Sequence, residues 1–132
     1  MAKPAILCVD DETVVLDSLK IQLKNEFGDA YLYEVAESAD EALEIIDEIE
    51  EQTPILVIVS DWLMPGLKGD EFLIKVHEKY PKIVKVLLTG QADNDAIERA
   101  KKAANLHNCL AKPWDVKELI QTIKSGLNQA EL

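Results

Sequence analysis

The feature that most restricts the fold of this chain is an alternation of two hydrophobic periods. Short, continuous apolar runs, which are typical of buried β-strands, alternate with segments whose apolar residues recur at the spacing of a helix face. The five runs cover residues 5–9, 31–36, 55–59, 83–88 and 109–111. The alternation predicts five strands, each followed by a helix.

The segments between the runs carry the start and stop signals of helices. Ser38 and Glu41 form a capping-box pattern that opens one helix, and Gly28 is placed to end another. Helices are expected at residues 12–27, from 38 to before Pro54, at 69–80, at 93–104 and from 116 onwards. The last helix should bury a stripe of Val116, Leu119, Ile120, Ile123 and Leu127.

Strands that are apolar along most of their length are typical of a parallel sheet covered by helices on both faces. Right-handed crossovers leave few ways to connect five such units. The predicted fold is therefore α/β, a flavodoxin-like (βα)5 doubly wound sheet with strand order 2-1-3-4-5. With 132 residues, of which 48% are hydrophobic, the chain is expected to form one domain over residues 1–132.

The charge balance restricts the partners. A net charge of -11 argues against direct binding to nucleic acid or to an anionic membrane, because such surfaces are bound through Lys and Arg. A cationic partner or a divalent metal fits better. The first apolar run has only five residues before Asp10 and Asp11, too few for a signal peptide or a membrane span, so a cytoplasmic protein is expected. Cys8 and Cys109 are expected to be free thiols in apolar surroundings.

Polar residues follow the strands at the sheet edge where such folds bind ligands. Asp10 and Asp11 come after the first strand, Asp61 after the third, Thr89 after the fourth and Lys112 after the fifth. Because the first and third strands are neighbours in the predicted order, their three carboxylates should converge and raise one another's pKa values. Such a cluster favours a hard divalent cation, Mg²⁺ or Mn²⁺.

The same residues suggest a chemistry. Lys112 would bring a fixed positive charge, and Thr89 a hydroxyl that can donate to an anion. Positioning and neutralisation of charge are what phosphoryl transfer requires, with Asp61 as the central nucleophile. Taken singly, an Asp pair before a helix is more often a helix cap, and a lysine in a loop is more often a solvated side chain.

Two other classes of protein share parts of this pattern. A phosphatase of the haloacid-dehalogenase type needs an acid-base Asp two residues after its nucleophile, and Leu63 occupies that position. A flavin-binding relative needs a phosphate-binding loop rich in Gly, Ser and Thr after the first strand, where this chain is acidic. Neither class fits as well as phosphoryl transfer to Asp61.

The motifs together resemble the receiver domain of two-component response regulators, and the likeness covers nearly the whole chain. They are Val9-Asp10-Asp11-Glu12, Asp61 with Met64-Pro65-Gly66, Leu88-Thr89-Gly90, and Lys112-Pro113. The resemblance implies that Asp61 accepts a phosphoryl group from a sensor histidine kinase or a histidine phosphotransfer protein. It implies that the domain catalyses only its own phosphorylation and dephosphorylation, and is not an enzyme in the ordinary sense.

The resemblance also assigns roles to the other residues. Asp11, Asp61 and the backbone carbonyl of Leu63 would bind Mg²⁺ directly, and Asp10 largely through water. Lys112 would contact the phosphoryl group through a loop with a cis Lys112-Pro113 bond, which proline makes affordable. Thr89 would swing towards the phosphoryl group.

The output implied by the resemblance is a change in the face made by the fourth helix, the fifth strand and the fifth helix. That face would act on an output domain or protein of unknown identity, and a phosphorylation-linked dimer is one form the output could take. The chain could stand alone or be cut from a longer multidomain protein.

The sequence departs from the family pattern at several positions. Cys109 stands where receivers usually place an aromatic switch residue, and Trp114 replaces the more common Phe after Lys-Pro. Trp62 and Gln91 flank the expected route of an attacking water, so they bear on the lifetime of the phosphoryl group. The departures keep open an alternative, a degenerate receiver that acts as a phosphorylation-independent interaction module.

Overall fold

The computed structural model describes residues 3–90 and 94–131, which form a doubly wound α/β fold. The strands are β1 (Ala5–Val9), β2 (Leu32–Ala36), β3 (Ile55–Asp61), β4 (Val84–Thr89) and β5 (Asn108–Ala111). The helices are α1 (Thr13–Phe27), α2 (Ala39–Ile49), α3 (Gly69–Lys79), α4 (Asn94–Ala103) and α5 (Val116–Glu131), with a 3-10 turn at Gly28–Ala30. None of these helices is both long and apolar enough to cross a membrane.

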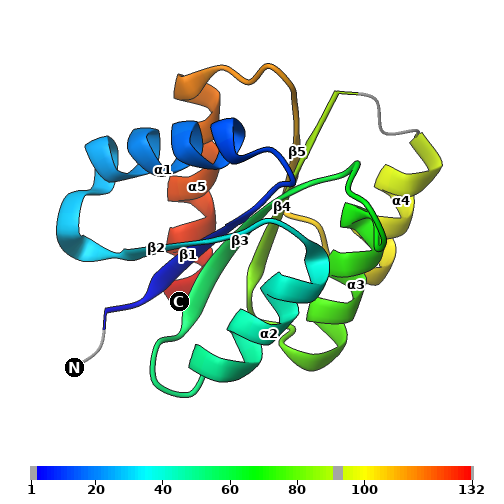
Figure 1. Cartoon of the computed structure of the whole chain (residues 1–132), viewed down its shortest axis with the longest axis horizontal. Coiled ribbons are helices and arrows are strands. Elements are labelled where there is room, and N and C mark those ends of the chain that lie inside the picture. The colour runs from blue at the N-terminus through cyan, green and yellow to red at the C-terminus, as the bar shows by residue number, and fades with distance from the viewer. Residues whose placement is uncertain (1–2, 91–93, 132) are drawn as a thin grey trace.

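The five strands form one parallel sheet in the order β2-β1-β3-β4-β5. The helices α1 and α5 cover one face of the sheet, and α2, α3 and α4 cover the other (Figure 1). The predicted class, connectivity and strand order are confirmed. In this arrangement β1 and β3 are direct neighbours, and Val9, the last residue of β1, pairs with Ser60, which comes just before the end of β3.

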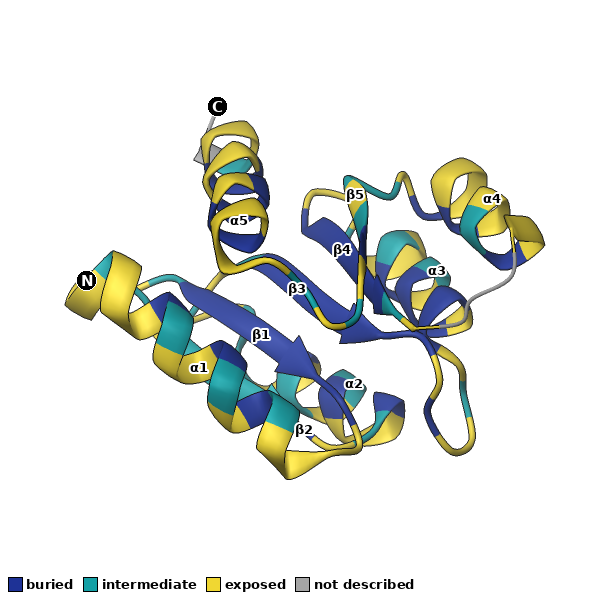
Figure 2. Cartoon of the chain, turned by 90° about the horizontal axis from the view of Figure 1, so that it is seen from above, coloured by how far each residue is buried: buried dark blue, intermediate teal, exposed yellow. Residues whose placement is uncertain are grey.

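The core has one layer on each side of the sheet. On the α1 and α5 side Leu19, Leu23 and Ile123 pack against the central strands, while Phe72 and Leu73 of α3 do so on the other side. β1 is buried throughout, and β3 is buried at every residue except the half-buried Leu56. Figure 2 shows that the helices are exposed on the sides that face away from the sheet. The two layers fix the central strands, and therefore the edge at which β1 and β3 end.

Several boundaries differ from the sequence expectation by a residue or two. β2 begins at Leu32 because the 3-10 turn comes first, β4 begins at Val84, and β3 continues through Asp61. The prediction that Val116 belongs to the buried stripe of α5 is wrong, since its side chain is 45% exposed. Val116 is the first residue of α5, and burial along this helix begins one turn later, at Leu119.

Lys85 interrupts the apolar run of β4 and is nevertheless buried, with 1% of its surface exposed. Its Nζ donates to the carbonyl oxygens of Ile83 and Pro81, at 2.6 and 3.4 Å, and lies 3.1 Å from Nδ1 of His77. Burial lowers the pKa of Lys85 to about 8. The lysine therefore ties the loop before β4 to α3 at the end of the sheet opposite to the acidic cluster.

Candidate functional site

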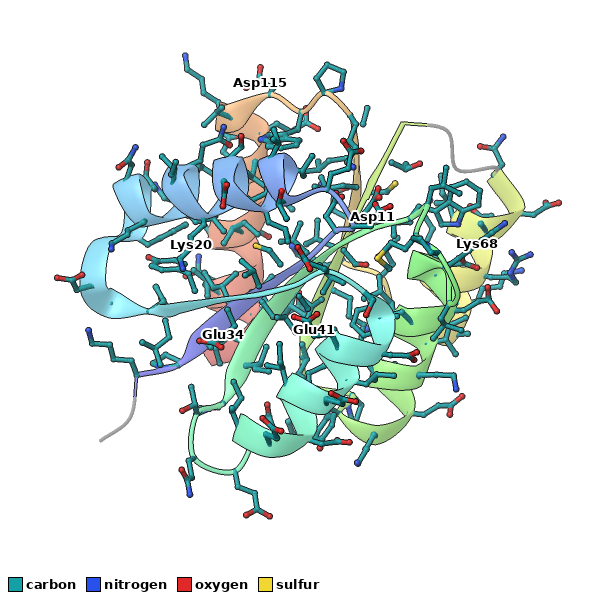
Figure 3. The ribbon with its side chains drawn as sticks, viewed as in Figure 1. Asp11, Lys20, Glu34, Glu41, Lys68 and Asp115 are labelled. Atoms are coloured by element: carbon teal, nitrogen blue, oxygen red, sulfur yellow. The ribbon has the colours of Figure 1, made fainter. Side chains whose placement is uncertain are left out.

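Three carboxylates meet where β1 and β3 end. The side chains of Asp10, Asp11 and Asp61 each place an oxygen within 4.8 Å of the others. The convergence predicted from the strand order is confirmed, and its cause is the direct pairing of β1 with β3. Figure 3 places Asp11 at this junction.

The three carboxylates differ in their surroundings. Asp10 is 0% exposed and Asp61 is 5% exposed, whereas Asp11 is open to solvent. One oxygen of Asp10 accepts a hydrogen bond of 2.9 Å from the backbone N–H of Glu12, as an acid before a helix commonly does. This bond closes a turn before α1 and does not cap the helix, whose N-cap residue is Glu12 and has no side-chain cap bond. The second oxygen of Asp10 faces the site.

Lys112 joins the two buried carboxylates. Its Nζ lies 2.7 Å from Oδ2 of Asp10 and 3.0 Å from Oδ1 of Asp61. The lysine is held by its backbone, whose N–H donates to the carbonyl of Thr89 at 2.9 Å, and is followed by a cis peptide bond to Pro113. Three carboxylates and one ammonium leave two negative charges, which is the balance that a divalent cation neutralises.

The pKa values in the cluster reflect burial first and charge second. Burial raises the pKa of Asp61, Lys112 opposes this through its hydrogen bond, and the nearby charge of Asp10 adds to the rise. Charge repulsion, the cause expected from the sequence, is therefore a secondary one. Burial alone would lower the pKa of Lys112, but its hydrogen bonds to Asp10 and Asp61 outweigh burial and raise it.

A pocket of about 430 Å³ opens over the cluster. Its lining includes Asp11, Asp61, Leu63, Thr89 and Lys112. Asp10 lies beneath this surface, so an ion in the pocket would meet Asp11 and Asp61 first. Oxygen ligands with open space on one side suit Mg²⁺, which keeps several waters and accepts phosphate oxygens.

The backbone that follows Asp61 is fixed on two sides. The N–H of Trp62 donates to the carbonyl of Leu88 on β4, and the carbonyl of Trp62 accepts from the N–H of Gly69, at 2.9 and 2.8 Å. A Cβ on Gly69 would lie only 2.8 Å from the Cα of Trp62 and closer still to the carbonyl oxygen of Asp61. The first turn of α3 therefore packs directly on the backbone of the central aspartate.

The departures from the family pattern have structural positions. Cys109 is half-buried against the layer of α2, α3 and α4, and both it and Cys8 are free thiols. Trp114 packs on the opposite layer, and its indole N–H donates to Oε1 of Gln22 on α1 at 2.8 Å. Gln91 lies outside the described residues.

The sequence reading missed a buried acid near the site. Asp70, in the first turn of α3, is 1% exposed and accepts a hydrogen bond of 2.9 Å from the indole N–H of Trp62. Its second oxygen lies 3.3 Å from Nη2 of Arg99 on α4. An acid in a first turn is common near the positive end of a helix, and no local spacing reveals a partner on another helix.

Comparison with known proteins places this geometry in a class. The signal receiver domain of an HD domain-containing protein from Pseudomonas fluorescens superimposes with a TM-score of 0.87, at 28% identity over 98% of both chains. A response regulator receiver domain protein (CheY-like) from Methanospirillum hungatei gives a TM-score of 0.85, at 31% identity over 98% of both chains. The fold is that of CheY-like receiver domains.

The sequence identifies the family. The response regulator receiver domain family matches residues 6–124, and the chain belongs to it. Among curated proteins the chain is 35% identical over 122 residues to the hydrogenase transcriptional regulatory protein HoxA of Cupriavidus necator, a match that covers 92% of this chain and 24% of that protein. The chain thus spans about a quarter of the length of this relative. A receiver domain is a signalling module of two-component systems, which implies a phosphodonor and an output module.

Proposed function

We propose that this receiver domain is a phosphorylation-dependent switch, in which Asp61 accepts a phosphoryl group from a sensor histidine kinase or a histidine phosphotransfer protein. The observation that carries the proposal is the contact of Lys112 with Asp61 in a pocket that Asp11 also lines, with Asp10 directly beneath it. This arrangement combines a nucleophile with charges that can hold a phosphoryl group on both sides.

In the proposed reaction, a carboxylate oxygen of Asp61 attacks the phosphorus of a phosphohistidine. The new O–P bond forms as the N–P bond breaks, and the electron pair returns to the imidazole nitrogen of the donor. When bound, Mg²⁺ would neutralise the charge that spreads over the phosphoryl oxygens. Asp11, Asp61 and the backbone carbonyl of Leu63 would hold the ion directly, with Asp10 acting through water.

Lys112 and Thr89 would hold the transferred group. Nζ of Lys112 already lies 3.0 Å from Oδ1 of Asp61, so it can donate to a phosphoryl oxygen attached there after a small movement. Thr89 lines the same pocket at the end of β4, where its hydroxyl can turn towards the new anion. A shift of Thr89 would bear on α4, the next described helix, and on β5, to which Thr89 is paired through Ala111.

The output would pass through the face formed by α4, β5 and α5, acting on an output domain or a separate protein. We propose that residues 1–132 form a single cytoplasmic receiver domain, either alone or as the receiver of a longer regulator. The position of Cys109 on β5 keeps a second candidate open, a receiver that binds its target without phosphorylation.

A small phosphodonor with Mg²⁺ separates the two candidates. The wild-type protein should gain the mass of one phosphoryl group, and Asp61→Asn should gain none. A wild-type mass that does not change, with a folded protein and an active phosphodonor, would favour the interaction module instead.

A further inference from the structure

Asp70 is a buried acid that the proposed transfer reaction does not use. It occupies the first turn of α3, where a negative charge is favoured by the helix dipole, and a buried indole N–H such as that of Trp62 needs an acceptor. The helix dipole and the indole donor together explain why an acid lies beside Trp62. They do not explain the third partner, Arg99, which reaches Asp70 from another helix across 29 positions of sequence.

The three side chains form one connected set. Trp62 donates to Oδ1 of Asp70 at 2.9 Å, and Nη2 of Arg99 lies 3.3 Å from Oδ2. A second cation, Lys68, lies 5.0 Å from the centre of the Trp62 ring, on the side of the molecule that carries α3 and α4 (Figure 3). The set thus links the residue after Asp61 to α3 and α4.

The two ends of the set differ in how firmly they are held. Trp62 is buried and fixed by backbone hydrogen bonds, whereas the side chain of Arg99 is 59% exposed and its ion pair with Asp70 is long, at 3.3 Å. A surface contact of this kind is easily broken, yet Asp70 at its other end is almost fully buried. Loss of Arg99 would leave a buried carboxylate with less compensation, which is destabilising and favours a rearrangement of the first turn of α3.

Movement of Asp70 would reach Asp61 by a short route. Gly69, its chain neighbour, packs on the carbonyl of Asp61 and on the Cα of Trp62 so closely that no side chain fits between them. The first turn of α3 cannot shift without displacing the backbone that carries the phosphoacceptor. Packed contacts of this kind change between discrete arrangements and do not deform smoothly.

We propose that Asp70 is a positioning residue that couples α4 to the phosphoacceptor through Arg99 and Trp62. A partner that binds Arg99 on the surface of α4 would change the phosphorylation of Asp61. Because such coupling is reciprocal, phosphorylation would in return weaken or strengthen the ion pair between Arg99 and Asp70. The inference rests on the proposed function of Asp61.

Two variants remove the ion pair between Asp70 and Arg99 from its two ends, and both keep the hydrogen bond between Asp70 and Trp62. Asp70→Asn keeps an oxygen for the Trp62 indole but loses the charge that attracts Arg99, and Arg99→Gln leaves the bond between Asp70 and Trp62 in place. Lys101→Gln is the matched control, since Lys101 is an exposed cation of the same helix that pairs with Glu98 at 3.5 Å and does not contact Asp70.

The measurement is the rate of phosphorylation of Asp61 by a small phosphodonor at fixed Mg²⁺. Arg99→Gln and Asp70→Asn should each slow it by about threefold or more, and the double variant should be no slower than either one, as expected for residues that act as a unit. Lys101→Gln should match the wild type. With ¹⁵N-labelled tryptophan, beryllofluoride, which mimics the phosphoryl group, should shift the Trp62 indole signal less in Arg99→Gln than in Lys101→Gln.

The outcomes separate this inference from the proposed function. Wild-type phosphorylation with rates unchanged in Arg99→Gln and Asp70→Asn would overturn the coupling and leave the switch intact. Effects of the two variants that simply add would also overturn it, because they would show two independent structural contacts. A wild-type protein that is not phosphorylated would overturn the proposed function, and the coupling with it.

Discussion

Replacing Lys112 by Met tests whether one ammonium holds the acidic cluster together. The substitution keeps most of the aliphatic length of a side chain that is 19% exposed, but it removes the partner of Asp10, which is 0% exposed, and of Asp61. Breaking a buried pair by removing one member costs about 3 to 5 kcal/mol. We expect about 3 kcal/mol here, because Asp61 can relieve part of the loss by taking up a proton as its pKa rises further.

The assay is urea unfolding at neutral pH, with and without Mg²⁺. Without a divalent cation, Lys112→Met should unfold at a lower urea concentration than the wild type. Mg²⁺ should stabilise the variant more than the wild type, because the site without the lysine's positive charge binds the cation more tightly. Lys117→Met is the control, an exposed lysine of α5, and should change stability by less than about 0.5 kcal/mol. A variant as stable as the wild type, with an equal response to Mg²⁺, would show that Lys112 does not hold the acidic cluster together.

Three further predictions concern the same framework. Asp61→Asn should raise the free energy of unfolding at neutral pH. Because the pKa of Asp61 is raised in the folded protein, the stability that this carboxyl contributes is present at low pH and is lost as pH rises through the folded-state pKa. The wild type and the variant should therefore have similar stabilities in acid, and equal stabilities at all pH values would contradict this. Gly69→Ala should lower the free energy of unfolding by about 1 to 3 kcal/mol and slow phosphorylation, because the added Cβ would lie 2.8 Å from the Cα of Trp62. Unchanged stability in thermal or urea unfolding would show that α3 does not pack on this backbone. Folding lowers the pKa of Lys85 from 10.5 to about 8, so between these pH values the folded protein binds fewer protons than the unfolded chain. The stability of the wild type relative to Lys85→Met should therefore rise by about 3 kcal/mol between pH 8 and 10.5. A flat difference across that range would place Lys85 in a wetter environment.

The sequence predicted those parts of the site that follow from topology. Once β1 and β3 are neighbours in a parallel sheet, Asp10, Asp11 and Asp61 must meet, and no side-chain detail is needed to see it. The same holds for Lys112, which follows β5 and reaches the cluster from the far side of β4. The carboxyl ends of parallel strands lie at one edge, so the order of strands is enough.

What the sequence did not reveal depends on contacts between distant surfaces. Asp70 has the appearance of an ordinary first-turn acid, because its partner Arg99 lies on another helix. Lys85 lies inside an apolar run, and the hydrophobic period of a sequence carries no information about which carbonyl oxygens can accept from a buried ammonium. Burial, the main cause of the raised pKa of Asp61, likewise emerges only when both core layers close over the sheet.

The surroundings of Asp61 in the acidic pocket lead us to propose this residue as the acceptor of a phosphoryl group. The most direct test is to treat the protein with a small phosphodonor and Mg²⁺, reduce the acyl phosphate with borohydride and locate the reduced residue by peptide mass spectrometry. We expect modification at Asp61 alone. It should depend on Mg²⁺ and should be less extensive in Lys112→Met. Modification at another carboxylate, or none in a folded protein, would contradict it.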